Sequence, residues 1–466
     1  MLSVRLTSES RPVVLEKTHS GIKPPGPKGS PILGNIPQMQ GKGLIDFYYD
    51  LWKQYGDVVS IKLGPLKSYL FVRPEHVQHI LVKNPETYIK GLSHDKLRTA
   101  IGNGILTLEG LDWRSQRKLM QPTYTPTNIS AFADLMLEEA ENMLSRWRST
   151  IKPGDQVDIN SEITRMTMSV ISRAMFGVDI GENFREAANA LVEMLNYTSS
   201  STISIIDMPL FVPTPKNQRL KQAKQTMKAF ISNVVEKRRR EGLGPDLLSM
   251  LMSAKDADTG ELMNDEQLHD EVLITFFAGR ETTATLLTWT LFNLSKNPSV
   301  EAKLHSELQT VLAGRRPTLA DMQNLPYTRM ILDETLRLYS PVAMVARDTT
   351  TDDMVDNFAI PSGSMVIVMP YITHRHPEFW EKPLEYYPEH FLPEQVAKRP
   401  RYAYYPFGAG QRICIGMHFA LMEAMLILAE VAQRYQLRLA TENDGTVKYI
   451  GVIRPASPIM MTMEAR

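Results

Sequence analysis

The sequence predicts a mainly helical protein with a small β portion, for three reasons. Strong helix formers dominate residues 132–260, and residues 264–298 carry a helical pattern without a break. Short strand patterns occur only near residues 58–72 and 345–369. No Gly/Ser linker, charge block or repeat divides residues 23–466, so we expect a single large domain behind a flexible arm at residues 1–22.

Composition narrows the class of protein. Lys plus Arg and Asp plus Glu both number 52, and a net charge of zero argues against nucleic acid as the main partner. A single cysteine, Cys414, excludes an internal disulfide and fits a reducing compartment, which predicts a cytoplasmic location. No run of roughly 20 apolar residues is present, so we predict no transmembrane anchor.

The first hundred residues mix helix and strand signals. Pro24-Pro-Gly-Pro27 predicts a stiff extended segment, and residues 44–55 have helical spacing up to Gly56. Residues 58–63 and 68–72 read as a hairpin around Gly64-Pro65. Residues 84–112 hold several glycines and little periodicity, which predicts a long irregular stretch of the kind that is often functional.

A helix beginning at Trp113 places Trp113 and Arg117 on one face, four residues apart. An indole N–H and a guanidinium are both pure donors, so the pair suits a carboxylate ligand. The alternative is a half-buried tryptophan beside a solvated arginine.

Residues 264–298 predict a helix about 48 Å long, with Asn264 and Gln267 as a capping box. Polar groups interrupt its apolar run at Arg280, Glu281 and Thr282. The adjacent acid and alcohol suit stepwise proton delivery, and the small residues before them, Ala278 and Gly279, would leave room beside the helix. The alternative is a polar notch that binds a buried water.

The only cysteine lies in the loop Phe407-Gly-Ala-Gly-Gln-Arg-Ile-Cys414-Ile-Gly416, ahead of a buried helix. A helix N-terminus and a nearby Arg412 favour a thiolate. With no second cysteine for zinc or an iron–sulfur cluster, a thiolate suits the proximal position of a haem iron. The alternative is an ordinary buried thiol.

These segments resemble the cytochrome P450 family. The Cys loop matches the family's Phe-x-x-Gly-x-Arg-x-Cys-x-Gly signature, and residues 278–283 match its Ala/Gly-Gly-x-Asp/Glu-Thr-Thr pattern. The resemblance implies the P450 fold, with haem b between the central helix and the Cys414 loop and with O₂ as cosubstrate. It assigns proton delivery to Glu281 and Thr282 and iron ligation to Cys414. Its haem-contacting positions fall on Trp113, Arg117, Ala278, Arg347, Phe407, Arg412 and Gly416.

A third motif, Glu334-x-x-Arg337, resembles the family's buried ion pair, which a later arginine completes. Here the later motif reads Pro388-Glu-His390-Phe391, so a histidine stands at the third position and leaves the geometry of the triad open. Another open question concerns the apolar break at residues 199–215, which is either a loop packed on the core or, by resemblance, a mobile lid.

The resemblance implies a monomeric monooxygenase acting on a hydrophobic substrate. No flavin, iron–sulfur or nicotinamide segment is evident, so electrons from NAD(P)H would arrive indirectly through a ferredoxin or flavodoxin and its reductase. We predict a long-chain fatty acid as substrate, with a terpenoid or another small hydrophobic molecule as the alternative. The intact Glu281–Thr282 pair argues against a peroxide-driven peroxygenase, and no signalling module supports a haem sensor. The predicted substrate-lining residues are Ile101, Leu106, Ile274, Phe277, Val342 and Val345.

Overall fold

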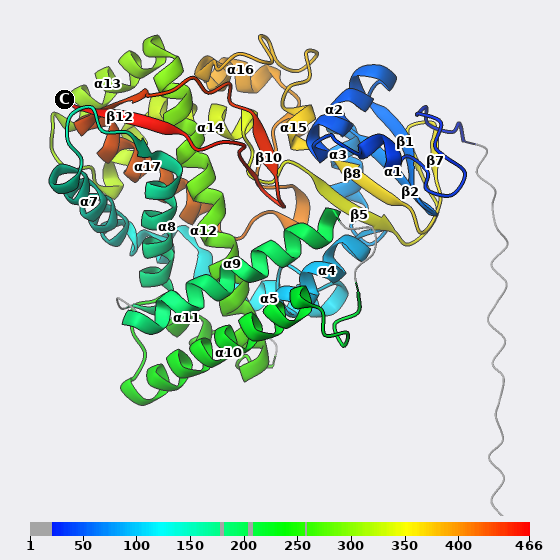
Figure 1. The fold of residues 1–466 in the computed structure, drawn as a ribbon, viewed down its shortest axis with the longest axis horizontal. Coiled ribbons are helices and arrows are strands. Elements are labelled where there is room, and N and C mark those ends of the chain that lie inside the picture. The colour runs from blue at the N-terminus through cyan, green and yellow to red at the C-terminus, as the bar shows by residue number, and fades with distance from the viewer. Residues whose placement is uncertain (1–20, 178–180, 204–207, 257–258) are drawn as a thin grey trace, which may run out of the picture.

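The computed structural model describes residues 21–177, 181–203, 208–256 and 259–466. Residues 1–20 of the arm predicted at residues 1–22 lie outside this range, while Ile22 forms a parallel bridge with Phe358. The structure is mainly helical with a small set of strands (Figure 1), as the sequence predicted. Of the described helices, none is both long enough and apolar enough to cross a membrane.

Most of the helices lie on one side of the molecule, and α12 runs through their midst (Figure 1). The helices are α1 (Ile36–Met39), α2 (Leu44–Tyr55), α3 (Pro74–Gln78), α4 (Gly91–Ile101), α5 (Gly110–Met120), α6 (Pro126–Ser130), α7 (Ala133–Thr150), α8 (Ile159–Phe176), α9 (Gly181–Ile203), α10 (Pro215–Glu241), α11 (Leu247–Ser253), α12 (Asp265–Lys296), α13 (Pro298–Leu312), α14 (Pro326–Leu338), α15 (Pro370–Thr373), α16 (Pro393–Lys398) and α17 (Met417–Arg434).

The strands form one five-stranded sheet and three smaller ones. The largest has the order β1-β2-β8-β5-β3, and β4-β12-β9 forms a three-stranded sheet beside the C-terminus, while β10-β11 and β6-β7 are hairpins. The strands are β1 (Val58–Leu63), β2 (Leu66–Phe71), β3 (Tyr88–Ile89), β4 (Val157–Asp158), β5 (Val345–Thr349), β6 (Asp353–Val355), β7 (Phe358–Ile360), β8 (Met365–Val368), β9 (Tyr435–Leu439), β10 (Val447–Tyr449), β11 (Ile453–Pro455) and β12 (Met460–Ala465).

The long helix α12 begins with the predicted capping box. The Asn264 carboxamide oxygen accepts from the Gln267 backbone N–H at 2.9 Å, and the Gln267 oxygen accepts from the Asn264 N–H at 3.1 Å. Two of the free N–H groups at this terminus are thereby satisfied. Most of the following residues are buried, because α8, α14 and α17 pack around α12.

The prediction of an irregular stretch at residues 84–112 was wrong, because α4 occupies its centre. Its sequence has only a weak apolar stripe, but α9 and β5 pack against it. Ala100 and Ile101 at its end are fully buried, and Gly102 ends the helix with a φ of 83°. Tertiary packing therefore supplies the stability that local periodicity does not signal.

The break at residues 199–215 is narrower than predicted, since α9 extends to Ile203 and α10 starts at Pro215. Residues 204–207 lie outside the described range. Met208, Leu210 and Phe211 are exposed at 54%, 48% and 86%. Of the two interpretations, a loop packed on the core is excluded for these three side chains.

Candidate functional site

The Cys414 loop is held by a hydrogen bond within its own backbone and by close packing of Gly410 against the segment at Leu81. The Cys414 N–H donates to the Phe407 carbonyl at 3.0 Å. Gly410 has a φ of 69°, and a Cβ there would lie 2.2 Å from the Leu81 carbonyl oxygen, so only glycine fits. Gly416 is the N-cap of α17. The thiol at the loop's end is exposed.

The protein surroundings do not by themselves favour a thiolate at Cys414, contrary to the prediction. Desolvation raises the pKa of the thiol, and the Gly416 N–H and the Arg117 charge only partly offset it. Because a coordinated thiol is deprotonated by its metal, the Cys414 thiolate needs the charge of a bound cation.

Cationic side chains gather beside this loop. Arg117 donates to the Ile413 carbonyl at 3.0 Å, and Arg412 donates to Glu109 at 2.8 Å. The Arg412 guanidinium also lies 3.9 Å from the centre of the Trp113 ring. Desolvation and, to a smaller extent, the Arg412 charge lower the pKa of Arg347 to about 10, although the Glu109 charge opposes them. Glu109 therefore faces more positive charge than it can neutralise.

Two further basic side chains near the Cys414 loop, Lys90 and His94, were not predicted from the sequence. The Lys90 ammonium donates to the Leu106 carbonyl, and His94 bonds the Lys90 carbonyl at 3.1 Å. Burial and then the neighbouring cations hold the pKa values of both well below their ordinary ranges. No motif signalled them, because α4 brings them to the site and α4 was not predicted.

Three charged residues form what we call the α12 cluster: Arg280 and Glu281 of α12 and Arg454 of β11. Glu281 is buried, and its Oε2 lies 2.6 Å from Arg454 Nη2. This contact lacks hydrogen-bond alignment, so it is an ion pair only. Arg454 is thus the ion-pair partner of Glu281, and the Arg280 guanidinium beside them keeps Nε and Nη1 unpaired within the described residues.

The residues around the α12 cluster divide between two faces of the helix. Ala278 is exposed, and the Thr282 hydroxyl donates to its carbonyl at 3.0 Å. Gly279 lies against α8, where an added Cβ would be 2.8 Å from Ile171 Cδ1. The prediction that Gly279 leaves room for a ligand is therefore wrong, since this glycine permits close packing of two helices.

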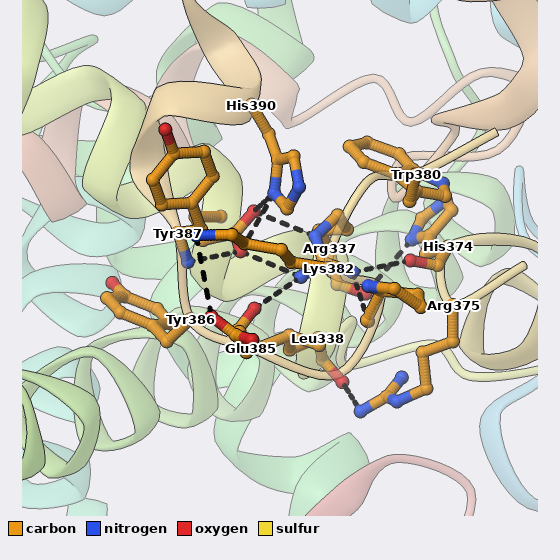
Figure 2. Close-up of polar contacts among 12 residues, drawn as sticks. Arg337, Leu338, His374, Arg375, Trp380, Lys382, Glu385, Tyr386, Tyr387 and His390 are labelled. Carbon is orange, nitrogen blue, oxygen red and sulfur yellow. Dashed lines mark hydrogen bonds and ion pairs between the residues drawn. The ribbon is translucent and has the colours of Figure 1, made fainter. Parts of the chain in front are cut away.

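The α14 cluster, which comprises Glu334, Arg337 and His390, is a second buried charge site (Figure 2). All five N–H groups of the Arg337 guanidinium donate hydrogen bonds. Nε and Nη2 donate to the two Glu334 oxygens at 2.8 and 2.7 Å, and the remaining three N–H groups donate to the carbonyls of His374, Pro383 and Glu385 at 2.7 to 2.8 Å.

His390 takes the third position of this cluster. Its Nδ1 lies 3.2 Å from both Glu334 oxygens, and its Nε2 contacts the Glu381 carbonyl. His390 therefore links Glu334 to the Glu381 carbonyl from the position where an arginine was expected.

A hydrogen-bonded path leads from the α14 cluster to Cys414. His374 contacts the Arg337 carbonyl through Nδ1 and accepts from the Tyr405 N–H through Nε2 at 2.9 Å. The Tyr405 carbonyl accepts from Gly408, and Phe407 accepts from Cys414. Burial and the Arg337 charge hold the pKa of His374 well below its usual range, which keeps this imidazole neutral. The predicted structural residues are thus linked to the Cys414 loop.

The six predicted substrate-lining residues do not share one environment. Leu106, Phe277 and Val345 are half-buried, and Val342 is 39% exposed. In contrast, Ile101 and Ile274 are 0% and 2% exposed within the hydrophobic core. The Ile274 side chain packs beneath Gly104, whereas Ile101 borders a cavity of about 1000 Å³ between α4, α10 and α12.

A buried carboxyl on α17 was also missed. Glu423 lies almost fully buried, and the Thr283 hydroxyl of α12 hydrogen-bonds its side chain. Burial raises its pKa to about 8, despite that bond. In the sequence, a single glutamate within an apolar helix does not indicate which residue of α12 it contacts.

The sequence profile of the cytochrome P450 family matches residues 24–463. The chain belongs to the cytochrome P450 family. Cyclooctatin synthase of Streptomyces melanosporofaciens is 34% identical to it over 88% of this chain and 89% of that protein. Cyclooctat-9-en-7-ol 5-monooxygenase from the same organism is 33% identical over 82% and 83%. Pentalenene oxygenase of Streptomyces avermitilis is 29% identical over 93% and 95%.

A solved structure supports the same assignment. The crystal structure of the cytochrome P450DA haem domain matches this P450 with a TM-score of 0.87 and 25% identity, covering 96% of this chain and 98% of that one. The P450 fold predicted from sequence is thereby confirmed, and so is the class of enzyme, a haem-dependent monooxygenase that uses O₂.

The residues present fit a haem. A single exposed thiol suits the iron, and the excess of cations over Glu109 suits the two propionates of the porphyrin. Cys414 would hold the iron, and Arg117, Arg347 and Arg412 would hold the propionates. The bound haem supplies activation of dioxygen, and the protein supplies positioning and protons.

Proposed function

We propose that this P450 hydroxylates a terpenoid at an unactivated C–H bond. The relatives that carry the proposal are cyclooctatin synthase, cyclooctat-9-en-7-ol 5-monooxygenase and pentalenene oxygenase, whose names refer to terpenoid compounds. They favour the terpenoid alternative over the long-chain fatty acid that the sequence predicted. The predicted lining residues that are partly accessible include Leu106, Phe277, Val342 and Val345, which are apolar and suit a hydrocarbon skeleton.

In this reaction one oxygen atom of O₂ enters the C–H bond and the other leaves as water. Two electrons and two protons are consumed. We propose that a ferredoxin or flavodoxin, reduced from NAD(P)H through its reductase, supplies the electrons one at a time to the monomeric enzyme. We assign proton delivery to Glu281 and Thr282, since a buried carboxylate and a neighbouring alcohol on α12 form an acid–alcohol pair.

Ligand titration of the ferric holoenzyme tests the substrate class. We expect a low-to-high-spin shift with pentalenene or a cyclic diterpene alcohol, and hydroxylated product once a surrogate ferredoxin and reductase are added. A shift and product with palmitic acid but with neither terpenoid would overturn the proposal. The reduced carbon monoxide complex should first show the Soret band of a thiolate-ligated haem, which verifies the loaded enzyme.

Substitution of the alcohol tests the proton assignment. Thr282→Ala should reduce hydroxylated product per electron pair by about 10²-fold, the lower end of what a positioned proton-transfer group contributes. Electrons should instead appear as hydrogen peroxide, because oxygen is still reduced but no longer cleaved. Unchanged coupling of electrons to product in this variant would contradict the assignment.

A further inference from the structure

The α12 cluster contains four buried polar atoms without a hydrogen-bond partner in the described part of the chain. They are Arg280 Nε and Nη1, Glu281 Oε2 and Arg454 Nε. A buried donor or acceptor left unpaired costs about 1–3 kcal/mol. Four such atoms on three adjoining residues therefore call for solvent, and buried waters usually bind such groups.

Three elements enclose the cluster. The Thr167 hydroxyl of α8 donates to the Arg280 carbonyl at 3.2 Å. On the other side, the Thr285 hydroxyl of α12 donates to the Ile453 carbonyl at 3.4 Å and holds β11 against the helix. The α12 cluster therefore lies where α8 and β11 pack on α12.

Arg454 lies between Glu281 and the protein surface. Its side chain is 31% exposed, whereas the Glu281 side chain that it contacts is only 7% exposed. Its Nη2 meets the carboxylate and its Nε is buried, so the exposed part of the side chain lies elsewhere on the residue. A flexible charged side chain in this position can order waters on both sides of the ion pair.

We propose that Arg280, Glu281 and Arg454 hold a small group of waters behind α12, and that Arg454 is a positioning residue for proton supply to Glu281. This inference rests on the proposed function, because it takes Glu281 as the proton donor. In each transfer, Glu281 receives a proton from a cluster water and passes it toward Thr282. Bulk solvent replaces that proton through the waters at Arg454, so the resting charges are restored.

The test substitutes Arg454 in the holoenzyme, with pentalenene as the probe and a surrogate ferredoxin and reductase as electron source. Arg454→Gln should lower product per electron pair by about tenfold and raise peroxide correspondingly, and the solvent deuterium isotope effect on product formation should increase. Arg454→Lys, which keeps the charge, should restore most of the coupling. Wild-type coupling and isotope effect in Arg454→Gln would overturn the inference.

A matched control exists on β9. Arg438 Nη2 lies 2.7 Å from Glu301, and the side chains are 32% and 10% exposed, close to the 31% and 7% of Arg454 and Glu281. Arg438→Gln removes an ion pair of similar exposure outside the α12 cluster, from a glutamate that also pairs with Arg466, and should leave coupling and isotope effect unchanged. An equal loss in both variants would mean that destabilisation, not proton supply, explains the result, and would overturn the inference.

A crystal structure of the holoenzyme provides a readout that does not depend on activity. Ordered waters should bond Arg280 Nε and Nη1 and Glu281 Oε2, and a dry cluster would contradict the inference. Glu281→Gln, measured in parallel, distinguishes a failure of the role of Arg454 from a failure of the proposed proton path. If Glu281→Gln loses coupling and Arg454→Gln does not, only the inference fails. If Glu281→Gln and Thr282→Ala both stay coupled, the proposed proton path itself fails.

Discussion

The α14 cluster and the α12 cluster both place guanidinium and carboxylate groups inside the protein, but they differ in how those groups are bonded. Arg337 uses all five of its N–H groups, and Glu334 accepts from Arg337, from the Tyr387 N–H and from His390. In the α12 cluster, Arg280 leaves two buried nitrogen atoms unpaired within the described residues, and Glu281 meets Arg454 without hydrogen-bond alignment.

The difference shows how buried charges can be sorted by role. A fully bonded cluster has nothing left to bind, so its charges fix the chain, here the segment that leads to Cys414. A cluster with unpaired atoms retains the capacity to bind water or to move a proton. We therefore expect replacement of the arginine to lower the free energy of unfolding much more in the α14 cluster than in the α12 cluster.

Replacing Arg337 should have the largest effect. Arg337→Met leaves Glu334 buried without its arginine partner and leaves three backbone carbonyls without a donor. We therefore expect a loss of about 3–5 kcal/mol in the free energy of unfolding. Haem content should fall as well, because the path through His374 to the Cys414 loop starts at Arg337. Urea unfolding and the carbon monoxide difference spectrum measure the two quantities.

The same change at Arg280 is the matched control. Arg280→Met removes atoms that already lack protein partners, and it should alter the free energy of unfolding by no more than about 1 kcal/mol. Similar losses in the free energy of unfolding for Arg337→Met and Arg280→Met would show that the hydrogen bonds of Arg337 do not make the α14 cluster more important for stability.

Glu423 sharpens the comparison, because it is a buried glutamate whose Oε1 has no hydrogen-bond partner among the described residues. Its pKa is raised to about 8, above the roughly 4.3 of an unfolded chain. Between these values the unfolded state loses its proton first, so this group makes wild-type stability fall as pH rises. Glu423→Gln removes that dependence.

Relative to wild type, Glu423→Gln should therefore gain on the order of 2 kcal/mol between roughly pH 5 and pH 8. Unfolding by urea at the two pH values measures the change. A stability difference that is constant across this range would mean that Glu423 titrates normally in the folded protein.

Gly279 should give the smallest effect. The Cβ of Gly279→Ala would lie 2.8 Å from Ile171 Cδ1. The strain exceeds the gain in helix propensity, so we expect a net loss of about 1 kcal/mol. Ile171→Val removes the Cδ1 atom and should recover stability in the double variant. If Gly279→Ala instead keeps its stability but blocks the terpenoid-induced spin shift, the glycine lines the ligand site after all.

Parts of the site that rest on local spacing could be predicted from the sequence. The capping box of α12, the Glu334–Arg337 pair and the turn from Thr282 back to Ala278 all join residues within one helical turn. The geometry of a helix alone brings such residues together, so their spacing is sufficient. The Cys414 loop was recognisable for a similar reason, since its glycines and cysteine are adjacent.

The tertiary structure decided everything that depends on distant segments. Arg454 meets Glu281 only because β11 packs on α12, and Lys90 and His94 join the cation cluster only because α9 and β5 stabilise α4. Ile274 looks like a lining residue in the sequence but is buried in the core. Apolar character specifies that a residue avoids water, while the packing of other elements decides whether it faces the core or a ligand.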